Sequence, residues 1–87
     1  MLTIRYAPTF IRMYRKLTPS LKEEVKEKII LLKDENNHQK LKVHKLSGKL
    51  SGRNSFTVNY KIRIVFRYEN NNTLNLLYVG NHDEVYE

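Results

Sequence analysis

Four side chains in the second half of the chain have the chemistry needed to cut a phosphodiester: His44, Arg63, His82 and Tyr86. Cleavage of RNA requires removal of the 2′-hydroxyl proton, protonation of the leaving 5′-oxygen, and stabilisation of the charge on the phosphate. Histidine can carry out either proton transfer near neutral pH, and arginine offers the phosphate a planar, permanently charged fork. No metal is needed, because this substrate supplies its own nucleophile.

Three of these residues also have a structural role open to them. His44 could hydrogen-bond a backbone carbonyl in its own loop, and Tyr86 could close the edge of the core. Arg63 could pair with a carboxylate such as Glu84. His82 follows a Gly-Asn break and is expected to be exposed, which favours a functional role. The functional interpretation requires Arg63 and His82 to lie on the same side of the fold.

Other kinds of active site find little support in the sequence. It has no cysteine, which removes disulfides, thiolate metal ligands and cysteine nucleophiles together. It contains neither a GxxxxGK[ST] loop nor a GxGxxG turn after a strand, and no pair of acids suits glycoside hydrolysis. His38, His44 and His82 are scattered, without paired carboxylates at ligand spacing. We therefore expect no metal and no cofactor.

The net charge of +7 is concentrated in one stretch, residues 36–68, which we call the basic block. It contains no Asp or Glu, whereas the rest of the chain has a net charge of −1. Its eight cations are Lys40, Lys42, Lys45, Lys49, Arg53, Lys61, Arg63 and Arg67. Segregated charge is typical of a site for a polyanion, so nucleic acid is favoured over a membrane surface or a role in solubility. We expect the cations other than Arg63 to contact RNA phosphates.

Hydrophobic periodicity predicts the elements that must position these side chains. Alternation over residues 2–6 predicts a short strand. Apolar residues at helical spacing predict one helix over residues 10–17 and a second over residues 18–34. Thr18 has the residue type of an N-cap, and Pro19 that of a first helical position. The two helices should form a hairpin with one shared apolar side.

The period changes in the second half of the chain. Residues 40–53 lack a clean period and predict a connecting loop, with at most one helical turn near Leu41. Even-numbered residues from 56 to 68 are all apolar, which predicts two strands joined by a tight turn near residues 59–61. A third strand follows over residues 73–79, with Leu74, Leu76 and Tyr78 facing the core. Residues 82–87 form a short tail.

These elements predict a single α+β domain over residues 1–87. An N-terminal strand, a two-helix hairpin and a three-stranded antiparallel meander would give a four-stranded sheet with the hairpin on one face. The other face would be open and would present Thr57, Lys61, Arg63 and Arg67. The apolar runs are too short to cross a bilayer, and the N-terminus lacks the apolar region of a secretory signal. We therefore expect a cytoplasmic protein without a membrane partner.

Three segments resemble a known family. They are His44-Lys-Leu-Ser-Gly48, Ile62-Arg-Ile-Val-Phe-Arg67 and Val79-Gly-Asn-His-Asp-Glu-Val-Tyr86. Together they are similar to the RelE/ParE superfamily of bacterial toxins of type II toxin–antitoxin systems, and most similar to the branch that includes RelE, YoeB and YafQ. The order of elements also matches, so the resemblance spans nearly the whole chain. The terminal segment is its most specific part.

The resemblance implies a RelE-like fold and an endoribonuclease, an mRNA interferase that cuts message in the ribosomal A site. It implies a cognate antitoxin protein as partner, and contacts between the basic face and ribosomal RNA. His82 matches the catalytic residue after the final strand, and Tyr86 matches an aromatic residue beside the cleaved nucleotide. Arg63 matches the arginine that holds the scissile phosphate, and His44 matches the histidine of the HxLxG loop.

The chain departs from its relatives at positions that concern the general base. Lys61 sits near a position where YafQ has an acid. Thr57 stands where YafQ-like members have a further histidine, and Lys40 about where YoeB-like members have a carboxylate. The base is therefore left open between a histidine, a lysine and none. Two other functions also stay open: a ParE-like inhibitor of DNA gyrase with the same fold, and an RNA-binding module without catalysis.

Overall fold

The computed structural model of the chain describes residues 1–86. Its strands and helices, in chain order, are β1 (Thr3–Tyr6), α1 (Pro8–Arg15), α2 (Pro19–Leu32), β2 (His44–Lys45), β3 (Asn54–Thr57), β4 (Arg63–Asn70), β5 (Thr73–Gly80) and α3 (His82–Val85). Short 3₁₀ turns occur at Glu35–Asn37 and Gly48–Leu50. The predicted α+β succession of strand, two helices, loop and three strands is confirmed. The short elements β2 and α3 were not predicted.

The strands form one five-stranded sheet in the order β1-β5-β4-β3-β2. β1 runs parallel to β5, and the other neighbours are antiparallel. The predicted number of strands was one too few, because β2 forms inside the segment expected to be a loop. There His44 pairs with Ser55, and Lys45 pairs with Asn54. A two-residue strand has no alternation by which it could be recognised, yet this pairing fixes His44 at the edge of the sheet, beside β3.

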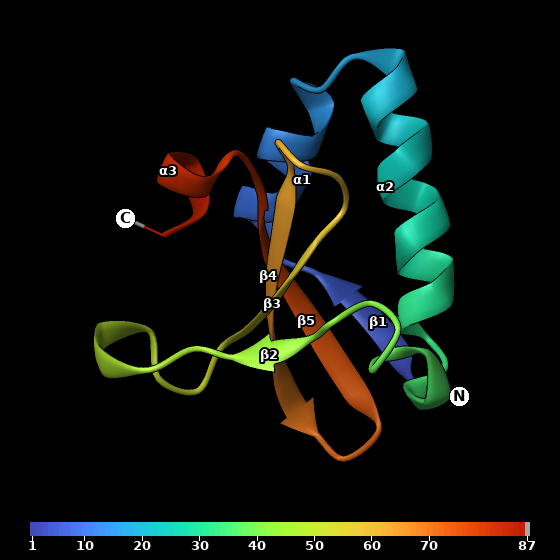
Figure 1. Cartoon of the computed structure of the whole chain (residues 1–87), viewed down its shortest axis with the longest axis vertical. Coiled ribbons are helices and arrows are strands. Elements are labelled where there is room, and N and C mark those ends of the chain that lie inside the picture. Colours follow the sequence, from blue (N-terminus) through green and yellow to red (C-terminus); the bar gives the residue numbers. More distant parts are fainter. Residues whose placement is uncertain (87) are drawn as a thin grey trace.

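Helices α1 and α2 form the predicted hairpin against one face of the sheet (Figure 1). Thr18 caps α2 by accepting a hydrogen bond from the Leu21 N–H at 3.3 Å, and Pro19 takes the first helical position. The buried core between the layers includes Phe10, Val25, Ile29, Leu32, Phe56, Ile64, Phe66, Leu74 and Leu76. Burial of this one face leaves the opposite face of the sheet for other contacts.

A bulge in β5 changes which of its side chains reach the core. The pairing with β4 skips Leu77, which lies between the paired residues Leu76 and Tyr78. This extra residue breaks the alternation, so Leu76 and Val79 both lie in the core. The expectation that Tyr78 faces the core was therefore wrong. Its ring lies beside the guanidinium of Arg53, with 5.5 Å between the Arg53 Cζ and the ring centroid.

Two further tyrosines of the even-numbered series lie outside the core. Tyr60 is 89% exposed because it sits in the turn between β3 and β4, where strand alternation no longer applies. Asn59 closes that turn by accepting two backbone hydrogen bonds with its side-chain oxygen. Tyr68, near the end of β4, is 41% exposed. Partial burial raises the pKa of its hydroxyl, and the carboxylate of Glu35 raises that pKa further.

The second face of the sheet is covered at one end by α3, contrary to the expectation of an open face. The chain turns after Gly80, and α3 lies against β4 and β5 on the side away from the helical hairpin (Figure 1). Val85 of α3 and Val65 of β4 are almost fully buried. A reciprocal capping box starts the helix: the Asn81 and Glu84 side chains each accept the other's backbone N–H at 2.9 Å. Residues 82–86 of the predicted tail are thus folded against the sheet, and Glu87 lies outside the described residues.

Candidate active site

One open cavity of about 380 Å³ gathers all four residues that were singled out for phosphodiester chemistry. Its lining residues are His44, Leu46, Ser47, Leu50, Arg63, His82 and Tyr86. They come from β2, the loop that follows it, the start of β4, and α3 with its next residue. Three segments that are distant in the sequence therefore meet at the end of the sheet where α3 covers it.

Tyr86 contacts two other residues that line this cavity, His82 and Arg63. The His82 and Tyr86 rings are 4.5 Å apart between centroids and meet edge to face at 68°. The Arg63 Cζ lies 5.9 Å from the centroid of the Tyr86 ring, at the outer limit of a cation–π contact. Tyr86 is half-buried and His82 is exposed. An aromatic ring, an imidazole and a guanidinium thus border the same open space, where a nucleotide could lie.

The fourth residue, His44, is joined to Tyr86 through a buried serine. The Tyr86 hydroxyl donates to Ser55 Oγ at 2.7 Å, and Ser55 Oγ lies 3.2 Å from His44 Nε2. The other ring nitrogen, Nδ1, lies 3.1 Å from the Lys42 carbonyl oxygen. His44 therefore has the structural contact considered for it and also borders the cavity. Ser55 was missed, because its link to the site depends on the β2–β3 pairing.

The structural alternative considered for Arg63 is absent. Glu84 is engaged in the capping box with Asn81, and no ion pair in the described residues 1–86 involves Arg63. The imidazole of His82 has only a distant carboxylate neighbour, with 3.7 Å between its Nδ1 and Asp83 Oδ1, and both side chains are largely exposed. Arg63 and His82 thus keep their polar groups available to a ligand.

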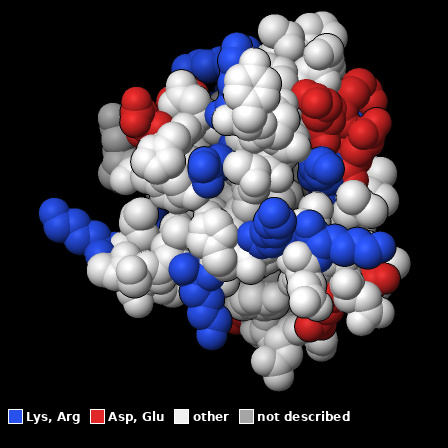
Figure 2. Space-filling view, viewed as in Figure 1, with Lys and Arg blue, Asp and Glu red and all other residues white. Residues whose placement is uncertain are grey.

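The seven remaining cations expected to contact RNA do not line the cavity. Six of them are exposed: Lys40, Lys42, Lys45, Lys49, Lys61 and Arg67. Arg53 is half-buried and lines, with Lys45 and Tyr68, a second hollow of about 380 Å³ that shares Leu46 with the first. Figure 2 shows Lys and Arg side chains across the face that carries β2, whereas acidic side chains gather toward α2. The segregation of charge in the sequence is thus preserved on the surface.

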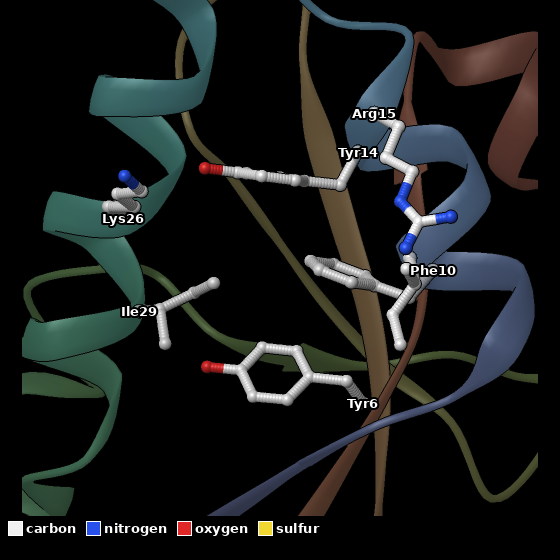
Figure 3. Close-up of a pocket in the computed structure, with 7 residues that line it drawn as sticks. Tyr6, Phe10, Tyr14, Arg15, Lys26 and Ile29 are labelled. Atoms are coloured by element: carbon white, nitrogen blue, oxygen red, sulfur yellow. The ribbon is translucent and has the colours of Figure 1, made fainter.

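A cavity of about 340 Å³ on the helical side of the sheet has a different character (Figure 3). It lies between α1 and α2, and its lining residues are Tyr6, Phe10, Ile11, Tyr14, Arg15, Lys26 and Ile29. This lining is mostly apolar and includes no imidazole and no carboxylate. It therefore offers no pair of groups for acid–base chemistry, in contrast to the cavity around Tyr86.

Residues 1–86 offer neither a metal site nor a membrane-spanning helix. No group of three or more His, Cys, Asp or Glu side chains in that range could hold a metal ion. Among the same residues, no helix has both the length and the apolar composition to cross a membrane.

Comparison with known proteins agrees with the fold. A family model described as the RelE-like toxin of type II toxin–antitoxin system HigB matches residues 10–82. No curated protein matches the chain in sequence.

Solved structures match over nearly the full length at low sequence identity. YafQ from E. coli strain BL21(DE3) superposes with a TM-score of 0.81 at 15% identity, covering 100% of both chains. The E. coli DinJ–YafQ toxin–antitoxin complex gives 0.75 at 18%, covering 99% of this chain and 98% of that one. The YoeB–YefM complex from Staphylococcus aureus gives 0.74 at 19%, covering 94% and 98%. At these identities the likeness shows the fold.

Proposed function

The chain belongs to the RelE-like HigB toxins of type II toxin–antitoxin systems, and on that premise we propose that it is an endoribonuclease that cleaves mRNA. The observation that carries the proposal is the convergence of His44, Arg63, His82 and Tyr86 on one open cavity. These are the groups that the chemistry of RNA cleavage requires, and they reach the cavity from separate segments. A purely structural set of residues has no reason to meet there.

In the proposed reaction the 2′-hydroxyl attacks the adjacent phosphorus without a metal ion. Arg63 binds the scissile phosphate and stabilises the negative charge that develops on it. His82 transfers a proton as acid or base, and Tyr86 stacks on or hydrogen-bonds the nucleotide. The products are a 2′,3′-cyclic phosphate and a 5′-hydroxyl end. The surrounding cations hold the RNA backbone on either side.

The proposal extends to two partners. We expect the substrate to be message in the ribosomal A site, with ribosomal RNA held by the basic block, because family resemblance favours the ribosome-dependent branch. We also expect a cognate antitoxin to cover the basic face with an acidic or amphipathic segment. Structures of two relatives are described as toxin–antitoxin complexes, which supports a partner of this kind.

The test is to express the toxin briefly without an antitoxin and to map the ends of ribosome-bound mRNA. The wild-type protein should arrest translation and leave cuts in the A site. His82→Ala combined with Arg63→Ala should abolish both effects, because it removes a proton-transfer group and the phosphate clamp. Arg12→Ala, on the exposed side of α1, should leave them unchanged.

Three outcomes would contradict the proposal. Undiminished toxicity of the folded double variant would show that these residues are dispensable. DNA damage without mRNA cleavage would indicate an inhibitor of gyrase. Steeply salt-dependent RNA binding without cleavage in translating extracts would indicate a binding module that lacks catalysis.

A further inference from the structure

The hydrogen bonds between Tyr86 and Lys42 all run in one direction. A carbonyl oxygen can only accept, so the contact of His44 Nδ1 with the Lys42 carbonyl places the proton on Nδ1. In the neutral ring Nε2 is then an acceptor, and its neighbour Ser55 Oγ must donate to it. Ser55 Oγ in turn accepts from the Tyr86 hydroxyl. Ser55 Oγ therefore accepts one hydrogen bond and donates one. The Tyr86 hydroxyl donates one, and its oxygen lone pair remains available to accept a proton from a substrate in the cavity.

This arrangement has the form of a proton relay. We propose that His44 is the general base of the reaction and acts through a relay, in which Tyr86 takes the 2′-hydroxyl proton and Ser55 passes a proton on to His44. The inference rests on the proposed nuclease function and names the base that the sequence left open. Ser55 is a positioning residue: its side chain is fully buried, so it reaches the substrate only through Tyr86.

The step balances without an outside reagent. The 2′-hydroxyl gives its proton to Tyr86 Oη, Tyr86 gives its own to Ser55 Oγ, and Ser55 gives its own to His44 Nε2. Meanwhile the 2′-oxygen forms a bond to phosphorus, and the bond from phosphorus to the 5′-oxygen breaks. The 5′-oxygen takes a proton from a protonated His82. His44 ends as an imidazolium whose Nδ1–H still donates to the Lys42 carbonyl, and solvent returns both histidines to their starting states.

Two residues of the relay, Lys42 and Ser55, have features that lower the stability of the fold unless they are compensated. Lys42, which supplies the carbonyl, has a φ of 58°, in the left-handed region that residues other than glycine rarely adopt. Ser55 places a hydroxyl among buried side chains, which is tolerable only because both of its hydrogen bonds are made. A core role alone would be filled better by an apolar residue at this position.

The charged groups near His44 allow a clean test. Arg63 and His82 border the same cavity, and Lys42 and Lys45 flank the imidazole in its own segment. A change at Ser55 leaves all of these charges in place. A changed pH profile in such a variant therefore reports the loss of the relay and not a new electrostatic environment.

The first experiment reads the His44 tautomer directly by long-range ¹H–¹⁵N NMR of the folded toxin at about pH 8, above the ordinary pKa of an imidazole. The wild-type ring should carry its proton on Nδ1. Ser55→Ala should shift it toward the Nε2–H form, because the donor to Nε2 is gone. Ser51→Ala, an exposed serine in the neighbouring loop, should change nothing. An Nε2–H ring in the wild type would overturn the relay.

The second experiment measures single-turnover cleavage of mRNA on programmed ribosomes from about pH 6 to pH 8.5, a range that spans the ordinary titration of an imidazole. The wild-type rate should follow a bell-shaped profile. It should rise with pH as His44 loses its proton, and fall at higher pH as His82 loses the proton that the 5′-oxygen needs. Ser55→Ala should cleave about 100-fold more slowly and lose that rise, whereas Ser51→Ala should keep both. Tyr86→Phe keeps the ring beside His82 and Arg63 but removes the hydroxyl, and it should show the same loss. The double variant should be no slower than either single one, because groups in one relay act as a unit.

The outcomes separate this inference from the function on which it rests. If the wild type cleaves and folded Tyr86→Phe cleaves equally fast with an unchanged profile, the relay is wrong and the nuclease stands. Should Ser55→Ala fail to fold, Tyr86→Phe decides the question, since it removes one oxygen from a half-buried side chain. If the wild type cleaves no message, the nuclease proposal fails and the relay fails with it as a catalytic device. The tautomer measurement then still reports whether the hydrogen bonds exist.

Discussion

At the scale of single residues, Arg63 is held by strand pairing and not by a counter-ion. It begins β4 and pairs with Thr57 on one side and Gly80 on the other. Its guanidinium lies beside the Tyr86 ring, and no carboxylate of residues 1–86 forms an ion pair with it. The backbone thus fixes where the side chain starts, while the fork of N–H donors remains available for a phosphate.

The available guanidinium of Arg63 predicts that even a substitution that conserves the charge should slow cleavage. Arg63→Lys keeps one positive charge but replaces a bidentate fork by a point charge. We expect cleavage on programmed ribosomes to slow by about 10- to 100-fold, equivalent to about 1.4 to 2.7 kcal/mol of transition-state stabilisation. Arg12→Lys on α1 is the matched control and should retain the wild-type rate. Equal rates for the two folded variants would mean that only charge at position 63 matters.

At the scale of elements, periodicity predicted the parts of the fold that bury a whole face. The hairpin and the long strands show repeats of about 3.6 and 2 because one side of each must reach the core. The prediction failed where no repeat can form: the two-residue strand β2, the bulge at Leu77 and the four-residue helix α3. These are local features, set by hydrogen bonds and not by patterns of burial.

The same limit applies to the candidate site. His44, Arg63, His82 and Tyr86 could be singled out by residue type and by family resemblance. Ser55 could not, because it acquires a role only when β2 pairs with β3 and when Tyr86, 31 residues away, folds back over the sheet. The sequence thus identified the groups that can do chemistry, and the structure adds how they are connected.

The packing of α3 makes Gly80 a sensitive position for the site. A Cβ there would lie 2.8 Å from Glu84 Oε1 and 3.2 Å from both Glu84 Cβ and Cδ. Gly80→Ala should therefore push Glu84 out of its capping box and shift α3 together with His82 and Tyr86. We expect denaturant unfolding to show that the free energy of unfolding falls by about 1 kcal/mol. The cleavage rate should fall by more than the accompanying decrease in folded protein accounts for.

Two substitutions of Glu84, the residue that a Cβ at position 80 would meet, test the same explanation. Glu84→Gln can still accept the Asn81 N–H, because glutamine also completes a capping box, and it should behave like the wild type. Glu84→Ala cannot, and it should resemble Gly80→Ala in direction. Wild-type cleavage by Gly80→Ala would mean that the position of α3 does not limit catalysis.

At the scale of the whole molecule, the basic block carries cations without acidic residues among them, whereas residues 1–35 mix eight cations with five acidic residues. The basic block supplies β2, β3 and most of β4, while the acidic residues of the first half lie on and beside α2. Since the cations near the cavity do not line it, their expected contribution is attraction and alignment of the RNA and not chemistry. The charge pattern therefore predicts how binding should respond to salt.

Removing three of these cations tests that expectation without disturbing the cavity. In a His82→Ala background, which prevents cleavage, Lys45→Ala, Lys49→Ala and Arg53→Ala together should weaken binding to a short single-stranded RNA. A plot of log Kd against log salt should lose about 2 from its slope, since each phosphate contact contributes about 0.7. The matched triple variant, Lys16→Ala, Lys22→Ala and Lys28→Ala, removes the same charge from α2 and the residue after α1. Because those lysines lie outside the basic block, it should leave the slope nearly unchanged. An equal loss in both variants would show that RNA senses only the net charge, and the segregation of charge would then need another explanation.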